Sequence, residues 1–323
     1  TNNTATDERP AWSPDGRQIA FVSDRNGTRS LWIMDEDGSN QTLLAALPAP
    51  GDMAQIDWSP DGTTIAAQVG SKGPEPVGSD NEIYLIDVAT GGSTQITSNS
   101  IFDGQPRFSP DGSKLLIERM VDMDHFEVFV IDADGSNPVN LTQSPGSWDF
   151  SPSWSPDGKY VTFASDREGP YDLWRMDADG SNPVQLTFTD GFDDKTDWSK
   201  DGKQIIYTTS EVDGFDIGIM NADGSNRTLL TENPIDEFAP RWQPLYTCQG
   251  SRATIVGTGG SDDITGTAGR DVIVGLAGND VIDAKAGDDA VCGGPGHDDM
   301  MGGLGNDFLN GQAGLDWVDY KTS

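Results

Sequence analysis

The segment from Gly257 to Asp319 divides into seven blocks of nine residues: GTGGSDDIT, GTAGRDVIV, GLAGNDVID, AKAGDDAVC, GGPGHDDMM, GGLGNDFLN and GQAGLDWVD. The fourth place of every block is glycine, at Gly260, Gly269, Gly278, Gly287, Gly296, Gly305 and Gly314. The sixth place is aspartate, at Asp262, Asp271, Asp280, Asp289, Asp298, Asp307 and Asp316. The eighth place is apolar, at Ile264, Ile273, Ile282, Val291, Met300, Leu309 and Val318. A glycine turn, a carboxylate and an apolar residue at this period predict a parallel β-roll.

These blocks resemble the repeats-in-toxin, or hemolysin-type, nonapeptide family, whose unit is written G-G-x-G-x-D-x-U-x. The resemblance covers residues 257 to 319 and implies a calcium-binding roll, with the fourth-place glycines and sixth-place aspartates as its metal-site residues. The front of the unit departs from the family, because only Gly294 and Gly303 keep the second glycine and Ala284 replaces the first. We expect weaker binding at the departing turns. A flexible Gly/Asp-rich linker is the alternative, but linkers do not keep an apolar residue in register.

The charge of the segment agrees with a calcium site. Calcium takes six to eight oxygen ligands, which aspartates and backbone carbonyls supply. In such a roll unit n stacks over unit n+2, so the aspartates form two rows: Asp262, Asp280, Asp298 and Asp316 in one, and Asp271, Asp289 and Asp307 in the other. Three slots and two slots predict about five Ca²⁺ ions. Residues 257 to 319 hold 12 Asp, one Arg and one Lys, a net charge of −10 that about five divalent ions would cancel.

A second repeat occupies residues 1 to 242. Its anchor is an aromatic residue followed by Ser-Pro-Asp-Gly, beginning at Trp12, Trp58, Phe108 and Trp154. A fifth copy begins at Trp198 with Lys200 in place of proline, and a sixth begins at Trp242 without the turn. The anchors are 46, 50, 46, 44 and 44 residues apart, and each unit reads as four short strands. This period and the absence of long helical patterns predict an all-β fold with a β-propeller.

The anchor repeats resemble the TolB-like, Pro-Asp-Gly propeller family, whose members commonly have six blades. This resemblance implies a fold that binds proteins or polymers, and it implies no single activity. Trp242 is not followed by further blade strands, and Thr1 occupies the place of a final fourth-strand threonine. We therefore expect six blades, one incomplete in this chain, with the missing strands upstream of residue 1. A five-bladed or open ring is the alternative.

The two repeats predict a domain order and a disulfide. We expect a propeller over residues 1–242, a linker over 243–256, the roll over 257–319 and a tail over 320–323. A bridge between Cys248 and Cys292 would tie the roll to the linker and close about 45 residues, which stabilises by roughly 4 kcal/mol. Such a bridge suits an oxidising, extracellular setting. Two unpaired thiols are the alternative.

Composition restricts the partners. The 323 residues carry a net charge of −33, which disfavours nucleic acid and anionic membrane surfaces. No stretch approaches a transmembrane span. Acids recur five residues before the anchors, at Asp7, Asp103, Asp149, Asp193 and Glu237, with Asp52 one step earlier in the second unit. They could form a ring around the propeller axis that binds a metal ion or a basic peptide, or each could cap its own loop.

Other motifs favour structure over catalysis. The Asp-x-Asp-Gly-Ser-Asn repeats place glycine fourth, whereas a calcium-binding EF-hand loop needs it sixth, so we interpret them as hairpin turns. His125 and His297 are expected to be solvated, and no G-x-S-x-G or H-E-x-x-H motif occurs. We therefore expect an extracellular or cell-surface calcium-binding protein whose propeller binds an unknown protein or polysaccharide. A secreted carbohydrate-active or peptide-cleaving enzyme, with an unrecognised site on the propeller face, is the alternative.

Overall fold

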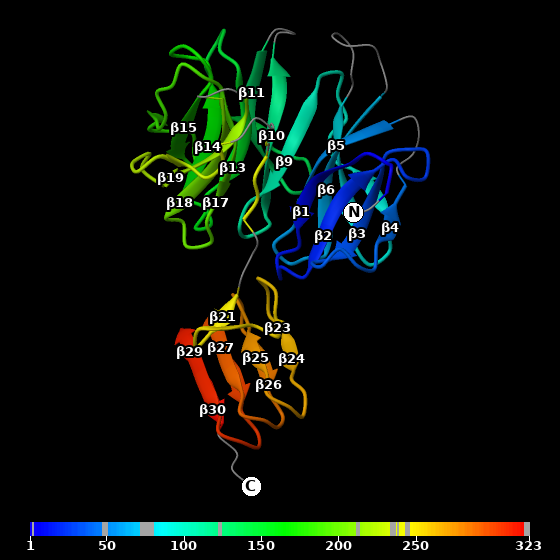
Figure 1. Cartoon of the computed structure of the whole chain (residues 1–323), viewed down its shortest axis with the longest axis vertical. Coiled ribbons are helices and arrows are strands. Elements are labelled where there is room, and N and C mark those ends of the chain that lie inside the picture. The colour runs from blue at the N-terminus through cyan, green and yellow to red at the C-terminus, as the bar shows by residue number, and fades with distance from the viewer. Residues whose placement is uncertain are drawn as a thin grey trace. The chain divides into compact units, whose positions relative to one another are not determined.

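The chain folds into two compact units, one built mainly from residues up to Trp242 and the other mainly from the residues after it. The computed structural model describes residues 1, 3–46, 51–71, 81–121, 125–210, 214–232, 237, 239–242 and 246–319, with backbone only at 51–54 and 71. The first unit appears in Figure 1 as blade sheets coloured blue to yellow-green, and the second as short strands coloured yellow to red. No described helix has the length and apolar character needed to cross a membrane.

The first unit consists of antiparallel four-stranded sheets that follow one another in strand order, as the sequence predicts. Blade 1 contains β1 Asp7–Trp12, β2 Gln18–Ser23, β3 Ser30–Asp35 and β4 Thr42–Ala45, and blade 2 contains β5 Gly51–Trp58, β6 Thr64–Ser71, β7 Glu82–Asp87 and β8 Ser93–Gln95. Blade 3 contains β9 Asp103–Phe108, β10 Lys114–Val121, β11 His125–Asp132 and β12 Val139–Asn140. Blade 4 contains β13 Asp149–Trp154, β14 Tyr160–Ser165, β15 Asp172–Asp177 and β16 Val184–Gln185, and blade 5 contains β17 Asp193–Trp198, β18 Gln204–Thr209, β19 Asp216–Asn221 and β20 Thr228–Leu229.

The described residues form five blades, so the expectation of six is wrong for this chain. The backbone N–H of Trp242 donates to Asp197 Oδ2 at 2.7 Å, just as the N–H of Phe108 donates to Asp57 Oδ2 at 2.8 Å. The sixth anchor therefore lies against blade 5 as the first strand of a following blade would. The described strands after Trp242 belong to the second unit, so none of them extends this segment into a sheet.

The anchor sequence builds the same turn in each blade. The Ser155 hydroxyl donates to Asp157 Oδ1 at 2.7 Å and accepts the Tyr160 N–H at 2.9 Å, which closes the turn between β13 and β14. A Cβ built on Gly202 would lie 3.4 Å from the ring of Pro156. The turn of blade 4 therefore packs against the turn of blade 5. The residues that recur in each anchor thus form the turn and the contact between neighbouring blades.

The second unit is a roll of two parallel sheets. One sheet contains β23 Ile255–Val256, β25 Val272–Val274, β27 Ala290–Pro295 and β29 Phe308–Ala313; the other contains β24 Asp263–Thr265, β26 Val281–Asp283, β28 Asp299–Met301 and β30 Trp317–Asp319. Every pairing joins residues 18 apart, as Ile264 with Ile282 and Ile282 with Met300. The expected stacking of unit n over unit n+2 is confirmed, and the eighth-place side chains from Ile264 to Leu309 form the core between the sheets, whereas Val318 is exposed.

The predicted disulfide between Cys248 and Cys292 is present, with a Cα–Cα distance of 5.7 Å. Cys248 ends the strand β21 Thr247–Cys248, which pairs with β22 Ser251–Arg252 in a small hairpin. Cys292 faces away from the roll core, in an outer apolar cluster with Val272 and Ala290. The bridge therefore fixes the hairpin onto the outer face of the roll.

The fourth-place glycines are needed because the turns stack closely. Gly305 has a φ of 138°, and a Cβ built on it would lie 1.8 Å from the carbonyl oxygen of Gly287 in the turn below. Gly260 begins its row, and a Cβ there would meet nothing closer than the Thr258 hydroxyl at 3.7 Å. A side chain at the fourth place would therefore clash with the neighbouring turn at Gly305, whereas at Gly260, in the first turn, it would not.

We predict that Gly305→Ala lowers the free energy of unfolding of the calcium-loaded roll by about 2–4 kcal/mol, since the side chain meets both a left-handed φ and a carbonyl. The matched change Gly260→Ala should cost less than about 1 kcal/mol. Denaturant unfolding followed by circular dichroism in excess calcium measures both values. Equal losses for the two variants would contradict the stacking argument.

Candidate functional site

The structure brings the seven sixth-place aspartates together in the two expected rows. In each row the backbone N–H of one aspartate donates to Oδ1 of the aspartate 18 residues later. The bonds run from Asp262 to Asp280 at 2.9 Å, Asp271 to Asp289 at 2.7 Å, Asp280 to Asp298 at 3.0 Å, Asp289 to Asp307 at 3.1 Å and Asp298 to Asp316 at 3.1 Å. Each inner carboxylate is thereby fixed between two turns.

The second oxygen of the inner carboxylates has no partner. Oδ2 of Asp280, Asp289 and Asp298 is buried, and none of these oxygens accepts a hydrogen bond from a described residue. A buried carboxylate oxygen without a partner is strongly unfavourable, unless a cation or a donor satisfies it. The described residues contain no group of three or more His, Cys, Asp or Glu side chains that could hold a metal alone. An ion here would therefore also use backbone carbonyls, which is the mixed oxygen set that calcium accepts.

The protonation equilibria of these aspartates point the same way. Burial raises the pKa of Asp280 to about 6, and the neighbouring carboxylates of Asp298 and Asp262 add to the rise. Burial is also the main cause of the raised pKa of Asp289 and of Asp298, with Asp307 and Asp316 as the nearest like charges. Ionised aspartates are thus destabilised in these rows, and a divalent cation would reverse the effect.

The glycine at the first place of a unit leaves room for the carboxylate of that unit. A Cβ on Gly293 would lie 2.3 Å from Asp298 Oδ2, and one on Gly275 would lie 2.5 Å from Asp280 Oδ2. The space beside Oδ2 of Asp280 and of Asp298 therefore exists because Gly275 and Gly293 lack side chains. The residues present fit a calcium ion, with carboxylate oxygens and carbonyls facing a space that a methyl group would fill.

The first two turns differ from the others. The N–H of Thr258 donates to Asp262 Oδ2 at 2.6 Å, and the Thr258 hydroxyl lies 3.0 Å from the same oxygen. Thr267 does the same for Asp271 Oδ2, at 2.6 Å from its N–H and 2.9 Å from its hydroxyl. Threonine at the second place therefore satisfies the oxygen that stays unpartnered in the inner turns. The sequence analysis expects weaker binding at turns whose front departs from the family, and these two turns are among them; it did not identify threonine as the feature that sets them apart.

Three of the acids five residues before the anchors, Asp7, Asp103 and Asp149, are ion-paired within their blades. Asp103 accepts from Arg119 at 2.6 and 2.8 Å, and Asp149 accepts from Arg167 at 2.9 and 3.0 Å. In blade 1, Arg25 lies 2.8 Å from Asp7; although burial opposes ionisation, this bond and others hold the pKa of Asp7 below its ordinary value. The structural interpretation is therefore supported in these blades, with arginine in place of backbone amides. The side chain of Asp52 lies outside the described residues.

The remaining motifs also have structural roles. The Asp-x-Asp-Gly-Ser-Asn segments are hairpin turns, as expected; Asn137 Nδ2 donates to Asp132 Oδ2 at 2.7 Å between β11 and β12. The expectation that His125 is solvated is wrong, because it is buried with Nε2 3.7 Å from Glu127 Oε1. His297 is exposed, and its Nδ1 accepts the N–H of Leu315 at 2.9 Å.

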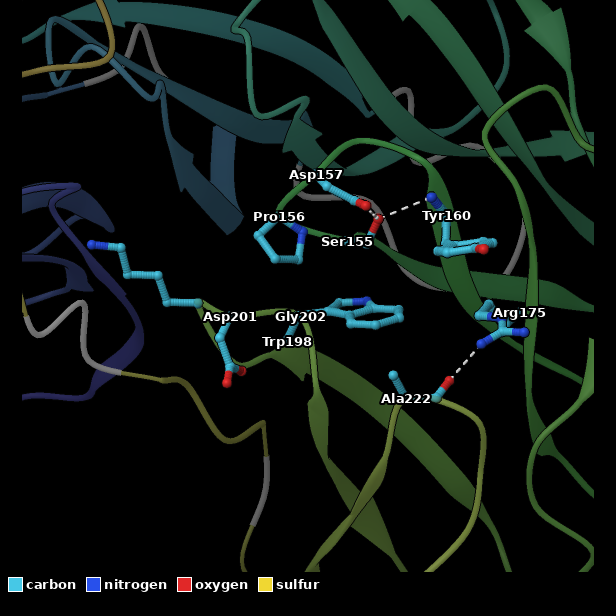
Figure 2. A pocket seen from close by; sticks show the side chains of 10 residues that line it. Ser155, Pro156, Asp157, Tyr160, Arg175, Trp198, Asp201, Gly202 and Ala222 are labelled. Atoms are coloured by element: carbon cyan, nitrogen blue, oxygen red, sulfur yellow. Dashed lines mark hydrogen bonds between the residues drawn. The ribbon is translucent and has the colours of Figure 1, made fainter. Parts of the chain in front are cut away.

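A pocket of about 250 Å³ lies between blades 4 and 5 (Figure 2). Arg175 on its wall donates to the carbonyl of Ala222 at 2.7 Å and lies 4.7 Å from the centre of the Tyr160 ring. Trp198 forms another part of the wall between the two turns. Arg175 is thus engaged by contacts with both blades.

The sequence analysis missed a second set of residues, three places before each anchor. These residues have left-handed backbone, with φ values of 56° at Arg9, 47° at Gln105, 52° at Ser151, 53° at Lys195 and 52° at Ala239. In β9, β13 and β17 they lie at a register shift against the neighbouring strand. Such a bulge re-aims a side chain. Aligning the repeats on their anchors and comparing the residues three places earlier would have drawn attention to this position in the sequence.

Three of these side chains meet in a buried network. Lys195 Nζ donates to Ser151 Oγ at 2.8 Å and to Gln105 Oε1 at 3.3 Å, although they belong to three different blades. Gln105 Nε2 donates to Glu118 Oε2 at 2.9 Å. Burial raises the pKa of Glu118 to about 7, against the opposing effect of Lys195. The innermost strands therefore converge on one polar cluster containing a titratable carboxyl.

Comparisons with known proteins agree with this architecture. A family model described as TolB beta propeller domain matches residues 30–248, and one described as RTX calcium-binding nonapeptide repeat matches residues 256–291 and 293–321. Both resemblances drawn from the sequence are confirmed by these matches.

Individual relatives cover the propeller in part. The chain is 30% identical over 153 residues to Tol-Pal system protein TolB of Bordetella pertussis, covering 47% of this chain and 33% of that protein. It is 31% identical over 138 residues to the uncharacterized peptidase YuxL of Bacillus subtilis, covering 33% of this chain and 21% of that protein. The chain thus spans about a third or less of these curated relatives.

Two solved structures share the propeller fold. TolB from Acinetobacter baumannii matches with a TM-score of 0.63 at 24% identity, covering 74% of this chain and 57% of that one. A putative TolB from Agrobacterium tumefaciens matches with a TM-score of 0.61 at 24% identity, covering 71% of this chain and 82% of that one. At this identity the likeness concerns the fold.

We predict that Glu118→Gln removes a pH dependence of stability. A folded-state pKa of about 7, above the ordinary 4.5, means that the propeller loses stability as pH rises from about 4.5 through 7. The stability difference between Glu118→Gln and the unchanged protein should therefore shift in favour of the variant by about 2 kcal/mol between pH 5 and pH 8. Denaturant unfolding followed by near-ultraviolet circular dichroism measures it, with exposed Glu168→Gln as control. Parallel pH profiles would contradict the role of Glu118.

Proposed function

The chain belongs to the TolB beta propeller domain family and carries RTX calcium-binding nonapeptide repeats, and from this premise we propose an extracellular, calcium-dependent binding protein. Its propeller, over residues 1–242, binds a protein or polymer partner. A linker over 243–256 leads to the roll over 257–319, which folds on Ca²⁺ and is followed by a tail over 320–323. The roll serves stability, secretion competence or surface attachment.

One observation carries the calcium mechanism: the buried Oδ2 atoms of Asp280, Asp289 and Asp298 have no partner among the described residues. At low calcium these carboxylates repel one another, and the entropy of the glycine turns favours the open chain. At millimolar calcium the ion supplies positive charge between adjacent turns, so that the apolar eighth-place residues can stack. Folding and metal binding are then one equilibrium.

The ligands follow from the two rows. The seven sixth-place aspartates supply carboxylate oxygens, and the fourth-place glycines supply carbonyls of the stacked turns. Five spaces lie between consecutive aspartates of the rows, which supports about five ions. The carboxylates of Asp262 and Asp271 already hold their threonines, so the spaces at that end compete with bonds that the inner spaces lack.

The location and the partner rest on separate support. The disulfide between Cys248 and Cys292 suits an oxidising compartment, and repeats of this family are typical of secreted proteins. The match to Tol-Pal system protein TolB supports a protein partner. The match to an uncharacterized peptidase covers 21% of that protein, and this chain has no G-x-S-x-G motif, so a binding role is favoured over peptide cleavage.

A calcium titration of the full chain, followed by far-ultraviolet circular dichroism, tests the mechanism. We predict a saturable gain of strand signal at submillimolar to millimolar Ca²⁺ and none with Mg²⁺ at the same concentration. No gain of strand signal with calcium would refute ion-driven folding.

Single substitutions test the role of the inner turns. Asp280→Ala and Asp298→Ala should raise the calcium midpoint by roughly tenfold or more, because each carboxylate lies between two neighbours of its row. Asp316→Ala, at the end of the same row, should shift the midpoint less. Equal midpoints for inner and terminal variants would contradict the assignment of slots to the rows.

A further inference from the structure

A cavity of about 500 Å³ lies within the propeller, where the innermost strands converge. Arg9, Gln55, Lys195 and Ala239 line it, and each lies three residues before an aromatic anchor. The bulged backbone at this position therefore directs the side chains of separate blades toward one space. A cavity of this size accommodates a small ligand or the end of a side chain from a partner.

The cavity concentrates cations in a chain that has few of them. Arg9, Lys195 and Arg241 line it, although the whole chain has only 20 Lys and Arg against 53 Asp and Glu. Arg9 is exposed and makes no hydrogen bond or ion pair with any part of the chain that the structure describes. Arg241 has one long ion pair, 3.9 Å from Asp197 Oδ1. Burial, and then the nearby Arg107, lowers the pKa of Arg241 to about 10, so its guanidinium stays protonated at neutral pH.

The two acids on the cavity wall are already engaged. Glu8 Oε1 lies 2.9 Å from Arg29 Nη1. Asp194 Oδ1 accepts the backbone N–H of Lys195 at 2.6 Å, and its Oδ2 lies 3.2 Å from Lys195 Nζ. The guanidinium of Arg9 therefore remains available for an anion. The two wall carboxylates favour a singly charged group over a phosphate, which would bring a second negative charge near them.

The rest of the wall suits an organic ligand. Phe192 and Phe215 line the cavity, and their ring centres are 6.1 Å apart at an interplanar angle of 82°. Gln55 and Thr208 add hydrogen-bonding groups. An anionic group facing Arg9 and Arg241 with an apolar body against the two rings would use both parts of the wall.

We propose that this cavity binds an organic carboxylate with an adjacent aromatic or apolar body, either a free acid or the acidic side chain of a peptide. The proposal rests on the proposed function, in which the propeller binds the partner. It assigns that binding to the cationic side chains at the bulges, Arg9 and Lys195. Arg9 pairs with the carboxylate, and Lys195 holds the wall through its bonds to Ser151 and Gln105.

Isothermal titration calorimetry with the full chain tests the proposal. The probes are phenylacetate and a capped tetrapeptide of alternating phenylalanine and glutamate. Their neutral counterparts are phenylacetamide and the corresponding glutamine peptide. We expect at least one carboxylate probe to bind with a Kd at or below the millimolar range, and the neutral probes to bind at least tenfold more weakly. Binding of phenylacetate alone identifies a free-acid site, and binding of the peptide alone identifies an acidic peptide site.

Variants locate the site. Arg9→Gln should weaken binding of the carboxylate probe at least tenfold. Arg17 is an exposed arginine on the first turn that does not line the cavity, so Arg17→Gln should leave the binding unchanged. Binding of neither carboxylate probe, equal binding of the neutral probes, or insensitivity to Arg9→Gln would overturn the proposal.

Measurement with calcium and with chelator separates this proposal from the calcium mechanism. Every residue that lines the cavity belongs to the propeller unit, so binding should persist without calcium. Failure of the roll to fold on calcium leaves this result unaffected. Failure of the carboxylate probes likewise leaves the calcium titration of the roll unaffected.

Discussion

The close stacking of carboxylates that lie 18 residues apart in the sequence is the main constraint on the structure of the roll. Each inner aspartate is fixed by a backbone N–H on one oxygen, and its other oxygen is buried without a partner. Such a stack opposes its own charge, and a cation between the turns would stabilise it. The glycines, the apolar eighth places and the disulfide shape that stack, and none of them neutralises it.

In the two N-terminal turns the same carboxylate oxygen has hydrogen-bond donors within the chain. Thr258 and Thr267 bond the carboxylate of their own unit through both N–H and hydroxyl. The hairpin of Cys248 covers the outer face at Val272, Val274 and Ala290. A preformed end followed by cation-dependent turns would give folding a starting point, because the first stacked turn is the costliest to order.

The propeller handles buried charge differently. In blades 1, 3 and 4 the acid five residues before the anchor pairs with an arginine of the same blade. Those arginines also stack on aromatic rings; Arg167 lies 4.9 Å from the Trp174 ring centre. At the bulges three residues before the anchors, the charge is only partly neutralised. Structural pairing and a cavity lined by cations thus occur two residues apart along the same strand, as at Asp7 and Arg9.

The sequence determined what depends on period and chemistry: the all-β class, the two rows of aspartates and the turn role of Pro-Asp-Gly. These follow locally, because a nine-residue period fixes which residues stack and a turn motif fixes its own bonds. Only the tertiary structure decided the number of blades, the pairing of the acids with Arg25, Arg119 and Arg167, and the burial of His125. It also decided the meeting of Gln105, Ser151 and Lys195, since their contacts join residues from different blades and depend on how strands bulge and pack, which no local spacing specifies.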